Sequence, residues 1–178
     1  MLSNSQSSRA AIVGQIGTGA ALTGEEAKEL VRHIMEDGFN KQDLSVVEAS
    51  FTKDYVRYGY GGPSANSLAE HIESLKAYHS SLTNARFEIQ QMVSDGSSVA
   101  VRYILRGTHT GTFMGVAASG NEVERHAVAI FTIVDGKVTE GHIVSDSGGL
   151  LGQLCLLYTS PRPRAATLSR MPSSAWIK

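Results

Sequence analysis

Acid/base chemistry in this chain is best sought at Asp146, an aspartate that follows a run of β-forming residues and precedes two glycines. A carboxyl group walled by apolar side chains has a raised pKa, so it can accept and donate a proton near neutral pH. His142, four residues earlier, carries an imidazole whose unperturbed pKa is ~6.5. We predict Asp146 as a catalytic acid/base that His142 assists. Two alternatives stay open: Asp146 caps the segment after it, and His142 is a half-exposed strand residue without a role.

Three further side chains are predicted to bind a ligand. Arg102 lies in the middle of a β-rich run, where a cation usually needs a carboxylate partner or an anionic ligand. It can equally pair with Asp146 or Glu140 in a purely structural role. Tyr58 and Tyr60 end the first predicted strand, where a tyrosine hydroxyl can donate a hydrogen bond to an enolate oxygen. Tyrosines in such places more often form the wall or rim of a pocket.

The last predicted hairpin decides which candidates share a surface. With Asp135 and Gly136 as the two turn residues, Val134 pairs with Lys137. Because side chains alternate along a strand, one face then carries Glu140, His142, Val144 and Asp146, with Arg125, Ala127 and Ala129 opposite them. The other face carries His126, Ile143 and Ser145. A bulge or a three-residue turn would reverse this assignment, which leaves the place of His126, a further candidate for ligand binding, open.

The elements that must position these residues are helices first and strands afterwards. Apolar spacing and capping residues predict helices over residues 23–40 and 42–51, and a third from residue 67 past residue 78. Alternation and turn signals predict strands over residues 54–60, 85–92, 99–105, 121–134 and 138–146, before a short closing segment at 150–154. This order favours an α+β fold over a doubly wound sheet.

Three motifs carry a family resemblance. They are Arg-Gly-Thr-His-Thr-Gly-Thr-Phe-Met-Gly at 106–115, Asp-Gly-Lys-Val-Thr-Glu-Gly-His-Ile-Val-Ser-Asp at 135–146, and Leu-Leu-Gly-Gln-Leu at 150–154. Together they resemble the SnoaL-like polyketide (ester) cyclase family, a branch of the nuclear transport factor 2-like superfold. The resemblance implies a cone, or cystatin-like roll, in which a curved mixed or antiparallel sheet wraps around N-terminal helices. It also implies a homodimer through the outer face of the sheet. His109, a further candidate for ligand binding, matches the family's Gly-Thr-His-Thr-Gly pattern, and its flanking glycines favour a bend-stabilising role over a catalytic one.

The resemblance implies a cofactor-independent enzyme, without metal, that performs an aldol cyclisation or isomerisation on a small hydrophobic carbonyl compound. Relatives often carry tryptophan at His142 and aspartate at Ile143. These departures favour a second hypothesis, a non-catalytic module for hydrophobic-ligand binding or dimerisation. Epoxide hydrolysis is a third hypothesis, but the acid that such relatives carry two residues after Arg102 is here Ile104.

Composition limits the remaining possibilities. A formal net charge of −1 over 178 residues argues against nucleic acid or an anionic membrane as the main partner. The histidines and the single cysteine, Cys155, do not form a metal-ligand pattern. We expect a flexible tail over residues 1–22, with a signal peptide as the weaker alternative, then a domain over 23–154 and a disordered, non-native tail over 155–178. A cytoplasmic location is the simplest expectation.

Overall fold

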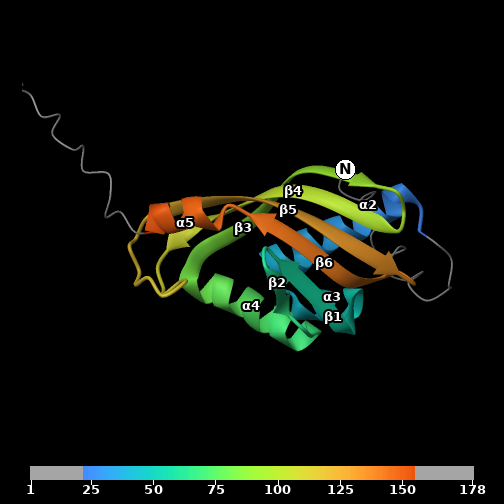
Figure 1. Ribbon diagram of the computed structural model, residues 1–178, viewed down its shortest axis with the longest axis horizontal. Coiled ribbons are helices and arrows are strands. Elements are labelled where there is room, and N and C mark those ends of the chain that lie inside the picture. The colour runs from blue at the N-terminus through green and yellow to red at the C-terminus, as the bar shows by residue number, and fades with distance from the viewer. Residues whose placement is uncertain (1–21, 155–178) are drawn as a thin grey trace, which may run out of the picture.

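The computed structural model describes residues 22–154 (Figure 1). The N-terminal helices precede the first strand, one helix lies between the second and third strands, and one follows the last strand. This α+β order confirms the predicted fold class. The predicted tail 155–178 lies outside the described residues, as does all of the predicted tail 1–22 except its last residue.

The first helix begins at the capping box that the sequence predicts. The Thr23 hydroxyl accepts a hydrogen bond from the Glu26 backbone N–H, and the Glu26 carboxylate accepts one from the Thr23 backbone N–H at 2.8 Å. The helix continues to Asn40 as predicted, but its last turns widen to the π type. Asp43 and Ser67 cap the next two helices. The helices are α2 (Gly24–His33), η1 (Ile34–Asn40), α3 (Leu44–Ser50), α4 (Leu68–Ser81) and α5 (Ser147–Leu154).

The strands form one mixed sheet in the order β2-β1-β6-β5-β4-β3. β1 and β6 run parallel, and every other neighbouring pair is antiparallel. In Figure 1, α2 passes behind this long twisted sheet, α4 lies beside β1, and α5 lies at one end beside β5. The strands are β1 (Phe51–Gly59), β2 (Gly62–Ala65), β3 (Leu82–Ser94), β4 (Ser98–His109), β5 (Glu122–Val134) and β6 (Lys137–Ser145).

Strand β2 is absent from the sequence prediction. Gly61 and Gly62 adopt positive φ angles of 107° and 128°, which favour glycine, and the chain folds back so that Gly62 pairs with Gly59 of β1. β4 also extends beyond its predicted end, because its last residues pair with the start of β3.

The register of the last hairpin corrects the predicted faces. Asp135 and Gly136 have φ angles of 49° and 71°, and Val134 pairs with Lys137 as predicted. The register then shifts after the Ile133–Val138 pair, because Thr132 pairs with Glu140 and β6 holds one extra residue. This bulge reverses every later side chain. The prediction that Arg125, Ala127 and Ala129 share a face with His142 was therefore wrong, as was the separation of His126 from His142.

The sheet has an inner face that packs on the helices and an outer face that does not. β5 shows the division most clearly, because its odd-numbered residues from Val123 to Ile133 are buried whereas the even-numbered residues from His126 to Ile130 are exposed. The inner face joins α2 residues such as Leu30 and Val31 in one apolar core. Within residues 22–154, no helix has the length and apolar character to cross a membrane.

Candidate functional site

A partly open cavity of about 440 Å³ lies between the inner face of the sheet, η1 and α4. This volume falls within the range of small-molecule sites. Aromatic side chains supply much of its wall: Phe39, Tyr78, Phe87, Tyr103, Phe113 and Phe131. The aromatic surface suits a flat hydrophobic ligand.

Arg125 projects into this apolar cavity from β5. It is only 7% exposed, because its position in the strand faces inward with Ala127 and Ala129. Its Nη1 donates a hydrogen bond of 2.8 Å to the Tyr78 hydroxyl of α4, and its guanidinium carbon lies 5.0 Å from the centre of the Tyr78 ring. Its Nε is buried without a partner in the described structure. The guanidinium therefore has N–H groups that form no hydrogen bond within residues 22–154, and they lie in the buried part of the cavity.

Tyr103 of β4 lies in the field of two cationic side chains. Burial raises the pKa of its hydroxyl to about 12, against the opposing effect of the positive charges of Arg125 and Arg57. The phenol is therefore protonated at neutral pH. It can donate a hydrogen bond to a carbonyl or enolate oxygen.

Arg57 enters the cavity from β1 and is held by four hydrogen bonds. Its Nε donates to Ser64 Oγ at 3.0 Å, and its Nη2 donates to Ser64 O at 3.3 Å and to Ser74 Oγ at 3.1 Å. Its Nη1 lies 3.1 Å from His71 Nδ1. Because arginine can only donate, Nδ1 accepts, and the proton of the neutral imidazole is on Nε2. Burial, reinforced by the Arg57 charge, lowers the pKa of His71 to about 3, so this histidine is neutral at neutral pH.

Within residues 22–154, neither cavity arginine forms an ion pair with a carboxylate, and no aspartate or glutamate lines the cavity. The described chain also contains no cluster of three or more His, Cys, Asp or Glu placed to hold a metal ion. The cavity is therefore aromatic, positively charged and rich in hydrogen-bond donors.

Asp146 does not line the cavity, although its chain neighbours Ser145 and Ser147 both do. Its side chain is exposed and accepts a hydrogen bond of 2.7 Å from the Gly149 backbone N–H. The capping alternative for Asp146 is thus confirmed, and its role as an acid/base stays a prediction.

His142 lies on the outer face of the sheet and not in the cavity. Its ring stacks on Tyr58, with the centroids 4.7 Å apart and the planes at 10°, and its Nε2 contacts the Glu140 carboxylate. Parallel pairing of β1 with β6 places Tyr58 beside His142 and sends both side chains outward. Neither Tyr58 nor His142 contacts the cavity, so no contact supports a role for them there.

Arg102 and His126 also lie on the outer face, where both are exposed. Arg102 has no ion pair in the described structure, so the predicted pairing with Asp146 or Glu140 is not formed. The His126 ring contacts Glu124 at 2.6 Å. These two candidates are thus separated from the cavity by the thickness of the sheet.

The two remaining candidates differ in their surroundings. Tyr60 is fully exposed and contributes to the cavity rim. His109 is fully buried at the end of β4, and its Nδ1 lies 3.0 Å from the Ser119 hydroxyl and accepts the Ser119 backbone N–H at 3.2 Å. It therefore holds the connection between β4 and β5, in agreement with the predicted structural role.

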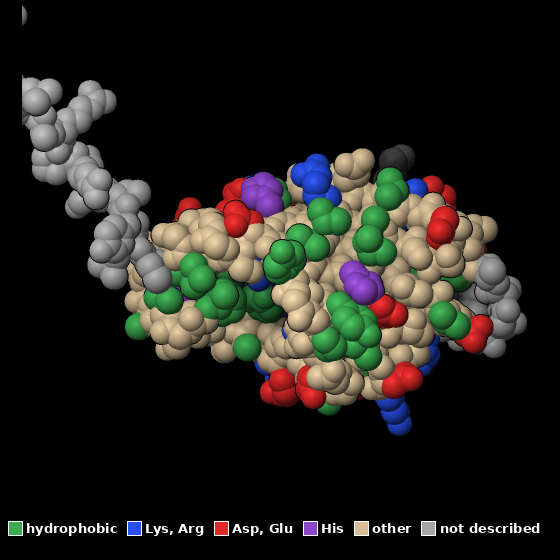
Figure 2. All heavy atoms as spheres, viewed as in Figure 1, with side chains coloured by type: hydrophobic (Ala, Val, Ile, Leu, Met, Phe, Trp, Pro, Cys, Tyr) green, Lys and Arg blue, Asp and Glu red, His purple; other side chains and the backbone are tan. Residues whose placement is uncertain are grey.

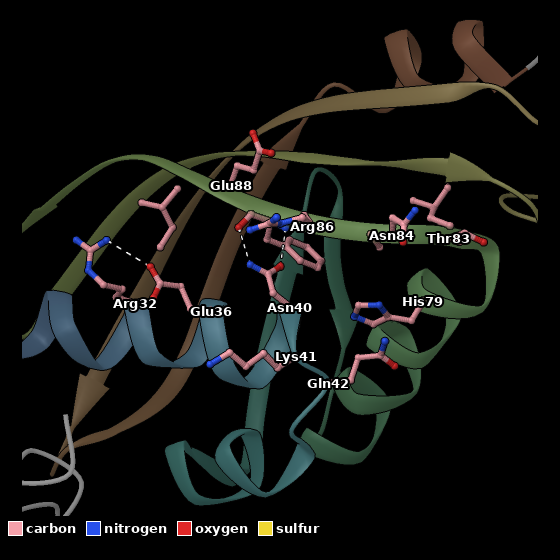
Figure 3. Close-up of a pocket in the computed structure, with 14 residues that line it drawn as sticks. Arg32, Glu36, Asn40, Lys41, Gln42, His79, Thr83, Asn84, Arg86 and Glu88 are labelled. Atoms are coloured by element: carbon pink, nitrogen blue, oxygen red, sulfur yellow. Dashed lines mark hydrogen bonds and ion pairs between the residues drawn. The ribbon is translucent and has the colours of Figure 1, made fainter. Parts of the chain in front are cut away.

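A second, larger hollow of about 970 Å³ lies outside the core, between α2, η1 and β3 (Figure 3). Its polar groups bond largely to the protein itself. The Asn40 amide bonds to both backbone groups of Phe87, at 2.7 and 3.1 Å, and Arg32 lies 3.7 Å from Glu36. Asn40 thereby completes the free edge of β3. The smaller inner cavity is the better candidate site, because it alone combines an aromatic wall with a buried donor that has no partner.

Sequence reasoning missed the polar residues of the cavity: Arg57, His71, Tyr78, Tyr103 and Arg125. A signal was present at Arg125, since alternation with Ala127 and Ala129 places a cation on an apolar strand face. Tyr78 follows Leu75 on the apolar stripe of its helix, so its spacing indicates a core position and not a polar one. Because the bulge in β6 cannot be read from the sequence, the predicted register placed Arg125 on the same face as His142.

A helix-backed mixed sheet with an aromatic cavity between its inner face and the helices defines the class as a nuclear transport factor 2-like α+β protein. The chain belongs to the SnoaL-like polyketide cyclase family, whose sequence model matches residues 29–154. A comparison with curated protein sequences gave no match.

Solved structures support this fold. AclR from Streptomyces galilaeus, provisionally assigned as a hydroxylase, is 27% identical, with a TM-score of 0.70 over 79% of this chain and 87% of AclR. A provisionally assigned SnoaL-like polyketide cyclase from Jannaschia sp. CCS1 is 21% identical, with a TM-score of 0.70 over 78% of this chain and 97% of its own. IdmH from Streptomyces antibioticus, provisionally assigned as a polyketide cyclase, is 24% identical, with a TM-score of 0.64 over 72% of this chain and 97% of IdmH.

Proposed function

We propose that this protein is a cofactor-independent enzyme that binds a hydrophobic carbonyl compound in the aromatic cavity. The reaction is a proton transfer, either an intramolecular aldol cyclisation or an isomerisation. The observation that carries the proposal is the Arg125–Tyr78 pair, a charged and a phenolic donor joined at 2.8 Å inside an apolar wall. Donors held in such a place stabilise negative charge that develops on a carbonyl oxygen.

Two phenols, Tyr78 and Tyr103, polarise the carbonyl group of the substrate in this proposal. Tyr78 accepts from Arg125 and so keeps its own proton for donation, and Tyr103 is protonated at neutral pH. Either hydroxyl can donate to the carbonyl oxygen while an α-proton leaves. The negative charge of the enolate is then stabilised by two phenols and the nearby guanidinium groups.

The proton is removed, in this proposal, by Asp146. Asp146 does not itself line the cavity, but it stands between two residues that do, Ser145 and Ser147. Turning the side chain away from Gly149 requires loss of the 2.7 Å hydrogen bond that caps α5. A net cost of about 1 kcal/mol is expected for such a bond, which ligand binding can offset.

The test is α-proton exchange of a bicyclic ketone, 2-tetralone, in D2O, followed by NMR over a series of ketone concentrations. We expect the protein to accelerate exchange, and Asp146→Asn to lower the rate by about 10²-fold or more. Asparagine can still accept the Gly149 N–H, so the cap is kept. Asp135→Asn, in the exposed hairpin turn, is the matched control and should exchange at the normal rate. Exchange no faster than in buffer would exclude the enzymatic proposal.

A non-catalytic hydrophobic-ligand-binding module is the second candidate. It is favoured by the absence of aspartate and glutamate from the described cavity lining. In that case 2-tetralone binds, Arg125→Gln weakens binding, and no exchange is accelerated. Epoxide hydrolysis gains no support, because Arg102 and Ile104 pair with Val128 and His126 on the outer side of the sheet.

We also propose that the protein is a homodimer through the outer face. Figure 2 shows hydrophobic side chains gathered over the sheet on the face that it presents. Four of the exposed large apolar residues belong to β5 and β6: Val128 at 43%, Ile130 at 45%, Val144 at 63% and, at the hairpin end, Val134 at 50% exposed. Val128 pairs directly with Val144, so the patch is continuous. An apolar sheet face of this kind usually requires cover.

A further inference from the structure

The cavity holds two guanidinium groups and no counter-charge among its described lining residues. On the surface, where water solvates the charge, some arginines such as Arg102 form no ion pair with a described residue and others contact carboxylates. Arg106, for example, bonds to Glu88 at 3.2 Å and also contacts Glu124. A cation in apolar surroundings ordinarily has an anionic partner, because an unpaired buried charge is costly. The lack of a carboxylate beside these arginines in the described structure therefore suggests that an anionic group of the ligand is their partner.

The two arginines are not equivalent. Arg57 uses all three of its nitrogens in hydrogen bonds to Ser64, Ser74 and His71, so its donors are largely occupied. Arg125 forms one hydrogen bond, to Tyr78, and its buried Nε donates to nothing in residues 22–154. Arg125 therefore has the free donors, whereas Arg57 contributes charge.

We propose that the substrate is an acid, a hydrophobic carbonyl compound whose own carboxylate binds Arg125. This inference rests on the proposed function and specifies its substrate class. A planar carboxylate fits the fork of a guanidinium, which can donate from Nε and Nη at once. The apolar remainder of the substrate packs against the ring faces of Phe87, Phe113 and Phe131.

The Arg57 charge strengthens this selection without contacting the carboxylate. Both arginines act on the hydroxyl of Tyr103, which places that hydroxyl in their combined field. In the buried part of the cavity such a field attracts an anion more strongly than at the surface. A neutral ester or amide of the same shape gains neither the field nor the charged hydrogen bonds.

The experiment compares two probes of equal shape, 2-naphthoate and 2-naphthamide, by isothermal titration calorimetry with the full chain. Hydrogen bonds to charged groups contribute ~1.5–3 kcal/mol, so naphthoate should bind about 10- to 100-fold more tightly than naphthamide. Arg125→Gln should remove that preference, and Arg125→Lys should keep part of it. Arg86→Gln, which removes an exposed arginine outside the cavity, should keep all of it.

Each outcome bears on the inference. Preference for the acid in the wild type that disappears in Arg125→Gln supports it. Equal binding of both probes overturns it and leaves the proposed function standing, because the cavity then takes neutral ligands. An acid preference that survives in Arg125→Gln assigns the carboxylate to another group and also overturns it. Binding of neither probe overturns both the inference and the proposed function. The wild-type comparison needs no variant, so misfolding of Arg125→Gln cannot prevent a decision.

Discussion

Arg125 and Tyr78 form a donor pair that joins strand β5 to helix α4 across the cavity. The Nη1–Oη distance is 2.8 Å, and the guanidinium lies 5.0 Å from the ring centroid, so the tyrosine contributes both its hydroxyl and its π face. The two residues are separated by 47 positions in the sequence. The pair orients the one cavity arginine that has free donors.

Removing only the hydroxyl tests this orientation. We expect Tyr78→Phe to lower the affinity for 2-naphthoate by about tenfold, because one hydrogen bond that fixes the guanidinium is lost while the ring remains. Calorimetric titration measures the change. Tyr60→Phe, at the exposed rim, is the control and should change the affinity little. Unchanged affinity in Tyr78→Phe would mean that Arg125 needs no orientation.

Arg125 should lower the stability of the empty protein. Its guanidinium is buried without a carboxylate, so Arg125→Met, which keeps an unbranched apolar stem and removes the charge, should raise the free energy of unfolding by about 1–3 kcal/mol. Urea denaturation measures this, and Arg86→Met on the surface should have an effect within about 0.5 kcal/mol. A less stable Arg125→Met protein would show that the arginine stabilises the fold.

His71 should make folding sensitive to acid. Its pKa is lowered to about 3 in the folded protein, by burial first and then by Arg57, whereas in the unfolded chain it is near the ordinary value of 6.5. Between these values the unfolded chain binds more protons, so stability falls as pH falls below 6.5. We expect a loss of roughly 2 kcal/mol by pH 5 from this residue.

Chemical denaturation at pH 7 and pH 5 measures the effect of His71. In His71→Gln the amide oxygen can still accept from Arg57, and the loss of stability between the two pH values should be smaller than in the wild type. An equal loss in both proteins would assign the acid sensitivity to other groups.

The outer face should control the oligomeric state. Val144→Glu places a charge in the apolar patch beside Val128, so we expect the proposed dimer to dissociate to a monomer that keeps its circular dichroism spectrum. Light scattering coupled to gel filtration measures the mass. Val134→Glu, at the end of the hairpin and similarly exposed at 50%, is the control and should remain dimeric. A wild-type protein that is already monomeric would contradict the dimer proposal.

Gly141 should be intolerant of a side chain. A Cβ at this position would lie 2.4 Å from the hydroxyl oxygen of Tyr55, which is fully buried. Gly141→Ala is therefore expected to cost about 1–3 kcal/mol in the free energy of unfolding. Gly148→Ala is the control, because its Cβ would meet only Asp146 Oδ1 at 3.9 Å. Thermal or urea unfolding compares the two variants.

The sequence by itself determined the class of fold and the family. Helix caps at Thr23, Asp43 and Ser67, and the Asp135-Gly136 turn, are local features, so their residues are adjacent in the chain and can be recognised there. The family motifs are likewise contiguous. This local information was sufficient to predict an α+β protein with its helices first.

Only the tertiary structure decided which side chains line the cavity. One extra residue in β6 turned His142 away from the face that carries Arg125, and strand alternation gives no sign of such a bulge. Tyr78 reaches Arg125 because α4 packs across the sheet, and Arg57 reaches His71 for the same reason. These contacts join residues that are distant in sequence, so their chemistry depends on register and packing, which no local pattern encodes.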